Sequence, residues 1–123
     1  MSSEDVPQLI MRIQERMIQS QRQLATVEAQ LTLHQREARK SELTLRELAS
    51  LDPDTPMYRS VGKMFLREDR SEIQDQLQKQ QREAKDTVLA LEKKKKYFER
   101  EAKEANDNLM DVLRSSRGGA GSS

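Results

Sequence analysis

The sequence contains no cysteine and no tryptophan, and its few aromatic residues are two tyrosines and two phenylalanines. Without cysteine the chain cannot form a disulfide or offer a thiolate to a metal ion, which is typical of proteins in a reducing compartment. The sequence also lacks an apolar run long enough to span a membrane or to serve as a secretory signal. We therefore expect a protein without a membrane partner, located in the cytoplasm, with the nucleus left open as a second compartment.

An excess of charge of one sign is also missing, since 22 basic and 21 acidic residues give a net charge of +1. Domains whose main role is to hold a nucleic acid are usually clearly basic, so this balance argues against a nucleic-acid partner. Hydrophobic residues make up only 34% of the chain and charged residues 35%, which leaves too little apolar material for a globular core. Glycine and proline are also scarce, so the composition indicates long helices or a coiled coil rather than disorder.

The first predicted helix covers about residues 6–51, where apolar side chains recur every seven positions in two lines. Asp5 and Pro7 favour a helix start, and Asp52 with Pro53 marks its end because a residue before proline avoids helical geometry. The repeat continues long enough to identify a coiled coil. The first line is Ile10, Met17, Leu24, Leu31, Ala38 and Leu45, and the second is Ile13, Ser20, Val27, His34, Ser41 and Leu48.

A second predicted helix covers about residues 70–114, with Asp69 as its N-cap and Glu72 as a carboxylate in its first turn. A strict period of seven predicts left-handed supercoiling of this helix around a partner helix. The main line of the repeat is Leu77, Ala84, Leu91, Phe98, Ala105 and Val112, and a second line contains Val88, Ala102 and Leu109.

These patterns predict a mainly α fold, an antiparallel two-helix coiled coil with one central β-hairpin that joins hairpins of other subunits in a sheet or an intersubunit β-barrel. The expected parts are an N-terminal helix (1–52), the hairpin module (53–69), a C-terminal helix (70–114) and a flexible tail (115–123), "SSRGGAGSS". Both termini should lie together at the free end of the helices. We expect modest stability for an isolated chain, because polar residues interrupt the seam at Ser20, His34, Ser41, Gln81 and Lys95.

The central stretch "TPMYRSVGKMFLRED" predicts two short strands, residues 57–61 and 64–67 or one residue beyond. Gly62 and Lys63 between them suit a type II′ turn, in which glycine supplies the positive φ of the first position. A lone two-stranded hairpin is marginal in water, and its edges carry unpaired backbone groups. We therefore predict that hairpins of other chains cover it, through an assembly surface made of Met57, Tyr58, Val61, Gly62, Met64, Phe65 and Leu66.

Two motifs resemble those of the prefoldin family. The stretch "DTPMYRSVGKMFL" is similar to the hairpin of its β-class subunits, and "LEKKKKYFEREAKEANDNL" provides a further match. The resemblance extends from Ile10 to Val112. It implies a heterohexamer, so that the partners would be two α-class and three further β-class subunits, with the hairpins forming a double β-barrel. It also implies capture of non-native polypeptides, notably actin and tubulin, by the ends of the coiled coils.

The same resemblance implies delivery of these polypeptides to the group II cytosolic chaperonin without nucleotide or any other cofactor. The chain itself has no GxxxxGK[ST] phosphate-binding motif. Residues that would bind client are apolar side chains near the two ends of the chain. They are Val6, Leu9, Ile10, Ile13, Leu109, Met110, Val112 and Leu113. The alternative is that these residues only complete the last heptads of the seam, although Leu9, Met110 and Leu113 fall outside it.

Other features support simpler interpretations. The lysines of 93–96 lie among glutamates, which favours a solvated helix face with pairs such as Glu92–Lys96 over a nucleic-acid site. His34 is expected to be a seam residue, because no second histidine, cysteine or serine accompanies it as a metal ligand or nucleophile. No arrangement predicts an enzyme. Besides the co-chaperone, a structural coiled-coil tether or scaffold remains as an alternative, and a nucleic-acid binder as a third, disfavoured one.

Overall fold

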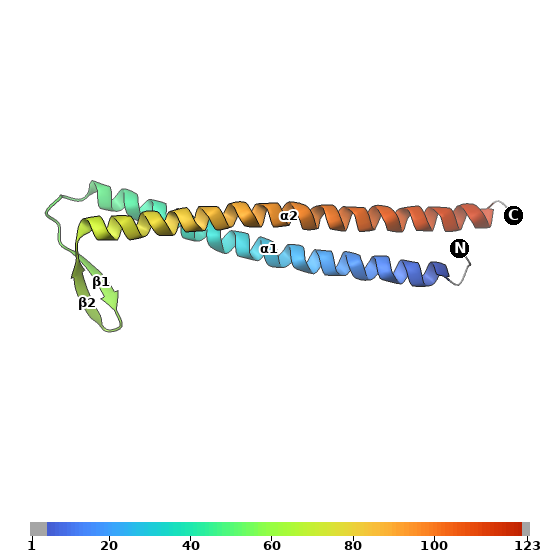
Figure 1. Cartoon of the computed structure of the whole chain (residues 1–123), viewed down its shortest axis with the longest axis horizontal. Helices are drawn as coiled ribbons and strands as arrows, with labels where there is room; N and C mark the ends of the chain where they lie inside the picture. The colour runs from blue at the N-terminus through green and yellow to red at the C-terminus, as the bar shows by residue number, and fades with distance from the viewer. Residues whose placement is uncertain (1–4, 122–123) are drawn as a thin grey trace. The chain divides into compact units, whose positions relative to one another are not determined.

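The structure, a computed structural model, describes residues 5–121 of the chain. Helix α1 covers Asp5–Ser50 and helix α2 covers Arg70–Gly121. Strands β1 (Met57–Val61) and β2 (Met64–Glu68) form an antiparallel hairpin between the two helices along the chain (Figure 1). The predicted mainly α fold with two long helices and one central hairpin is therefore confirmed.

Three of the four helix ends agree with the local sequence signals. Helix α1 begins at Asp5, and in its last turn the amide of Leu51 bonds to the carbonyl of Leu48 at 3.2 Å. Helix α2 begins at Arg70, directly after the predicted N-cap Asp69, whose carbonyl accepts a hydrogen bond from the amide of Ile73 at 3.2 Å. The first of these bonds satisfies a carbonyl at the end of α1 that lacks an intrahelical partner, and the second is the first intrahelical bond of α2.

The C-terminal end of α2 differs from the prediction, since the helix continues to Gly121 and residues 115–121 are helical. Glycine weakens a helix by about 1 kcal/mol relative to alanine, but it keeps the backbone N–H, so it does not by itself stop propagation. The predicted boundary after Arg114 is thus wrong as a helix end. That these residues are flexible in solution stays a prediction, and residues 1–4, 122 and 123 lie outside the described part.

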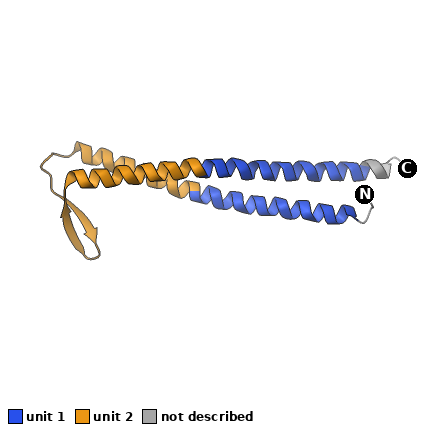
Figure 2. Ribbon diagram, in the orientation of Figure 1, with its two compact units in different colours: residues 1–30, 91–123 blue, residues 31–90 orange. Residues whose placement is uncertain are grey.

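The chain divides into two compact units, each of which contains part of both helices (Figure 2). Unit 1 comprises residues 1–30 and 91–123, and unit 2 comprises residues 31–90 with the hairpin. Within unit 1 the helices run antiparallel, because Arg16 contacts Glu101 whereas Glu28, later in α1, contacts Lys95, earlier in α2.

The seven-residue repeats form the buried seam in each unit. Every predicted seam position of α1 is buried or half-buried, and so are those of α2. In unit 1 the most enclosed side chain is Ala105, which has no exposed surface. No large side chain among residues 5–117 is completely buried, so each seam is thin. Buried seam residues include Ile13, Ser20, Val27, Leu91 and Ala105 in unit 1, and Leu31, Ser41 and Ala84 in unit 2.

The hairpin has the predicted register and turn. Val61 pairs with Met64 next to the turn, and Met57 pairs with Glu68 at the other end. Gly62 has a φ of 61°, and within residues 5–121 no residue other than glycine has a positive φ. Lys63 therefore has a negative φ, as the second position of a type II′ turn requires. This turn matches the twist of the flanking strands, which explains why glycine precedes lysine here.

Candidate assembly and client-binding surfaces

Both faces of the hairpin carry apolar side chains. Successive residues of a strand point to opposite faces, and residues paired across two strands share a face. The pairing places Met57, Arg59, Val61, Met64, Leu66 and Glu68 on one face, called the aliphatic face here. The opposite face, called the aromatic face, carries Tyr58, Ser60, Phe65 and Arg67. The structure therefore brings all the predicted assembly residues together, but on two different surfaces.

Most of these side chains are open to solvent within the single chain. Phe65 is 72% exposed and Met64 66% exposed, whereas Met57 at the base of the hairpin is buried. The sheet has only two strands, so each strand also presents an unpaired edge. Exposed apolar groups that are contiguous, with free strand edges beside them, mark an interaction site. That this surface joins the hairpins of other chains stays a prediction.

An ion pair at the base of the hairpin was not anticipated from the sequence. The Nε of Arg59 lies 2.7 Å from Oε1 of Glu68 on the aliphatic face. The second carboxylate oxygen, Oε2, is buried and has no hydrogen-bond partner, the one such side-chain atom found within the described residues. A buried acceptor without a partner is costly. The alternation of side chains along the strands predicts that Arg59 and Glu68 share a face. It does not predict that one oxygen of Glu68 has no hydrogen-bond partner.

Arg70 is a second residue that the sequence reading missed. Its guanidinium donates hydrogen bonds to the carbonyls of Leu48, Leu51 and Asp52, the latter two at 3.0 and 3.1 Å. Helix α1 has no basic residue in its own last turn. A cation beside the last carbonyls of a helix satisfies free acceptors and offsets the partial negative charge there. Arg70, the first residue of α2, thus caps the end of α1.

The predicted client-binding residues all belong to unit 1, but only some of them line a groove there. Leu9, Ile13 and Val112 line one groove together with Arg12, Arg16, Asn108 and Asp111. Val6, Leu9 and Val112 line a second groove with Asp111, Ser115 and Ser116. Leu9, which falls outside the seam, therefore lies on both grooves. Of the remaining predicted residues, Ile10, Leu109 and Leu113 are half-buried and Met110 is exposed.

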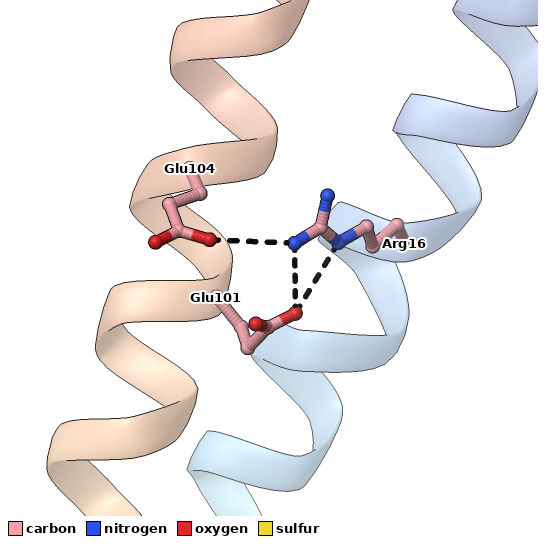
Figure 3. Close-up of polar contacts among 3 residues, drawn as sticks. All are labelled: Arg16, Glu101 and Glu104. Atoms are coloured by element: carbon pink, nitrogen blue, oxygen red, sulfur yellow. Dashed lines mark hydrogen bonds and ion pairs between the residues drawn. The ribbon is translucent and has the colours of Figure 1, made fainter.

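A charge cluster joins the two helices of unit 1 beside the first groove (Figure 3). The Nε and Nη2 atoms of Arg16 donate to Oε2 of Glu101 at 3.3 and 2.9 Å, and Nη2 also lies 3.6 Å from Oε2 of Glu104. The hydrogen bond and the charge of Glu101 raise the pKa of Arg16 above its ordinary value. Arg16 directly precedes seam residue Met17, and charged residues that flank a seam often pair across helices. That signal could have identified Arg16 but not its partner.

We expect Arg16→Gln to lower the Tm of the assembled protein by a few degrees at low ionic strength and by less at high salt. The pair is partly exposed, so salt screens it. Because the raised pKa keeps Arg16 charged throughout the neutral range, the arginine loses its charge, and with it this contribution, only in strongly alkaline solution, whereas in acid the pair ends when its carboxylates are protonated. Arg46→Gln is the control, because Arg46 pairs with Glu42 on its own helix. Circular dichroism measures the Tm of each variant. If both variants lose the same amount, Arg16 does not stabilise the protein through its contact with the other helix.

Two polar features of the sequence, His34 and the lysines of 93–96, form contacts typical of a coiled coil. His34 is half-buried at the seam of unit 2, and its Nδ1 lies 3.3 Å from Oε2 of Glu37, so the seam interpretation is confirmed. The ion pairs of the described residues do not include the expected pair of Glu92 and Lys96. Lys95 instead lies 3.9 Å from both Glu28 and Glu99.

Two further features are absent from the described part of the chain. Within residues 5–121 no group of three or more His, Cys, Asp or Glu side chains could hold a metal ion. In the same range no helix is both long and apolar enough to cross a membrane.

Two long helices that pair through a heptad seam, with an exposed hairpin inserted between them, define a helix–hairpin–helix subunit. The chain belongs to the prefoldin subunit family, whose family model "Prefoldin subunit" matches residues 11–116. It is 34% identical over 105 residues to prefoldin subunit 1 of Danio rerio and 33% identical to that of Homo sapiens, covering 85% of this chain and 86% of each relative. A probable prefoldin subunit 1 of Schizosaccharomyces pombe is 33% identical over 87% of this chain and 96% of its own length.

A solved structure shows the same fold. The crystal structure of the prefoldin beta subunit from Thermococcus strain KS-1 matches with a TM-score of 0.79 at 23% identity, over 85% of this chain and 92% of that chain. The family match, the curated relatives and this fold together confirm the sequence resemblance to prefoldin. Membership of this family means that the chain is a chaperone component that assembles with other prefoldin subunits.

Proposed function

We propose that this chain is a β-class subunit of a heterohexameric co-chaperone with two α-class and four β-class subunits. In this proposal the hexamer captures unfolded polypeptides, among them actin and tubulin, without ATP and delivers them to the group II cytosolic chaperonin. The observation that carries the proposal is the hairpin, whose apolar side chains are exposed on both faces and whose edges are free. Neighbouring hairpins are the simplest cover for such a surface, because they bury the side chains and pair the backbone groups at once.

The two grooves of unit 1 support the client-binding part of the proposal. Each groove is open and is lined by three aliphatic side chains together with polar ones, among them Arg12 and Arg16 in the first groove and Ser115 and Ser116 in the second. Burial of one such aliphatic side chain contributes roughly 1.5–3 kcal/mol before the costs of ordering, so one contact is weak. Several subunits that act on one unfolded chain would add their weak contacts through effective concentration. Binding of this kind holds a client without nucleotide and still releases it.

The proposal also covers the expectations on activity and location. We infer that the chain has no enzymatic activity and needs no cofactor, because prefoldin subunits are chaperone components. We propose the cytoplasm as its location, since the proposed partner chaperonin acts there. The alternative function, a coiled-coil tether or scaffold, explains the helices but gives no role to an exposed hairpin with two apolar faces.

Mixing the purified chain with prefoldin α-class and other β-class subunits tests the proposal. Native mass spectrometry should show a hexamer that contains two α-class subunits and at least one copy of this chain. That hexamer should suppress the aggregation of actin diluted from denaturant in the absence of nucleotide, as followed by light scattering. If the chain remains a stable, monodisperse monomer and does not bind the other subunits, the result supports the scaffold alternative instead.

A further inference from the structure

The outward surface of α2 in unit 1 is more basic than the sequence suggests. Between Glu92 and Asp107 acidic and basic residues are intermixed and nearly balance. In the structure some of these charges pair with each other and others do not. Glu101 and Glu104 contact Arg16 of α1, and Glu99 lies beside Lys95. Three carboxylates of this segment thus contact Arg16 or Lys95, and none of the three forms an ion pair with the other cations of the segment among the described residues.

Four of the remaining cations share one face, called the basic face, which consists of Lys93, Lys96, Arg100 and Lys103. Each lies two positions along the chain from a buried or half-buried seam residue, so it points about 200° around the helix from the seam. For example, Lys96 and Arg100 flank Phe98 in this way. All four side chains are exposed, and none forms an ion pair with any residue that the structure describes.

We propose that the basic face binds acidic segments of unfolded polypeptides. This inference rests on the proposed function and adds a charged contact to the apolar ones. From Lys93 to Lys103 the face is about 15 Å long, at 1.5 Å per helical residue. An extended chain covers that length with about five residues at 3.3 Å each. The matching ligand is therefore a short extended segment rich in aspartate and glutamate.

The limits of the face favour a peptide over a nucleic acid. Glu92 precedes the first cation and Asp107 follows the last one, so a continuous phosphate backbone would meet negative charge at both ends. Nucleic-acid surfaces usually neutralise many successive phosphates and belong to clearly basic domains, whereas this chain has a net charge of +1. A segment of a few acidic residues fits between these carboxylates. Lysine ammonium groups on flexible stems suit such variable partners, because they act as mobile point charges.

The test uses the assembled hexamer and a fluorescein-labelled peptide of alternating glutamate and serine. The variant Lys96→Gln/Arg100→Gln/Lys103→Gln should weaken peptide binding about tenfold in fluorescence anisotropy, since three partly screened charge contacts are lost. Lys79→Gln/Arg82→Gln/Lys85→Gln is the matched control. It removes the same number and kind of exposed cations from α2 in unit 2, and they too form no ion pair with a described residue. Glutamine is a good helix former, and equal helicity by circular dichroism verifies folding of both variants.

The affinity of the control hexamer for the peptide should lie within about twofold of that of the unsubstituted hexamer. The affinity of the unsubstituted hexamer should fall steeply with added salt. Equal losses in the two variants would overturn the proposal, because binding would then depend on general charge. It is also overturned if a single-stranded oligonucleotide binds the same face more tightly than the peptide does. Failure of the unsubstituted hexamer to suppress actin aggregation would refute the proposed function alone, because peptide binding is measured separately.

Discussion

Replacement of Phe65 by aspartate should abolish incorporation of this chain into the hexamer while leaving its helices folded. The Phe65 side chain is 72% exposed in the single chain, so the substitution removes little from the chain itself. Burial of a phenylalanine at an interface contributes roughly 1.5–3 kcal/mol, and an unpaired carboxylate in the same place adds a penalty of its own. The sum is several kcal/mol per subunit, which corresponds to more than about a hundredfold loss in assembly constant.

Native mass spectrometry of mixed subunits measures this effect, and circular dichroism verifies that helicity is unchanged. Leu89→Asp is the control, because Leu89 is 58% exposed on α2 in the same unit but lies outside the hairpin. It should leave assembly within about twofold of normal, as is usual for a surface substitution. A hexamer that forms from the Phe65 variant at normal yield would remove the aromatic face of the hairpin from the assembly surface. Met64→Asp tests the aliphatic face in the same way, and normal assembly of both variants would exclude the hairpin.

The second large effect concerns client binding by unit 1. The triple variant Leu9→Ser/Met110→Ser/Leu113→Ser should assemble normally but lose most of its ability to suppress actin aggregation. These residues lie outside the predicted seam lines, so they are the tip residues least needed to pair the helices. Each lost apolar contact costs roughly 1.5–3 kcal/mol before ordering terms are subtracted. Capture through several weak contacts falls steeply when each contact weakens.

Light scattering of denatured actin against hexamer concentration gives the measurement, read as the molar ratio needed for half suppression. Leu33→Ser/Leu43→Ser/Leu89→Ser is the matched control, since it removes three exposed aliphatic side chains from unit 2. A shorter chain, residues 14–108, should behave like the tip variant, with assembly kept and suppression weakened. If the tip and control variants suppress equally well, the predicted tips are not the client site.

Local signals explain why most of the fold was predictable. The heptad lines identified the seam, because a period of seven can only be buried by a partner helix of the same kind. Gly62 identified the turn, since the first position of a type II′ turn requires a positive φ, and the observed value is 61°. Asp69 identified the start of α2 through its role as N-cap. In each case the necessary information lies within a few residues or within one repeat.

Contacts between distant residues were not predictable in the same way. Arg16 and Glu101 are 85 positions apart, and their contact depends on the register of two antiparallel helices. The cap that Arg70 provides for α1 and the free oxygen of Glu68 depend likewise on how the chain returns after the hairpin. The basic face depends in the same way on the contacts of Arg16 and Lys95 with the neighbouring carboxylates. The helix end at Gly121 was not predicted, because a segment rich in glycine and serine has low helix propensity and indicates a flexible tail.

The cap formed by Arg70 has a consequence for how such subunits can diverge. Its hydrogen bonds join the end of α1 to the start of α2 directly, so this contact does not involve the side chains of the hairpin. Substitutions in the hairpin can therefore accumulate without unwinding either helix terminus. A gene duplicate could therefore change these few strand residues while both helices stay as inherited.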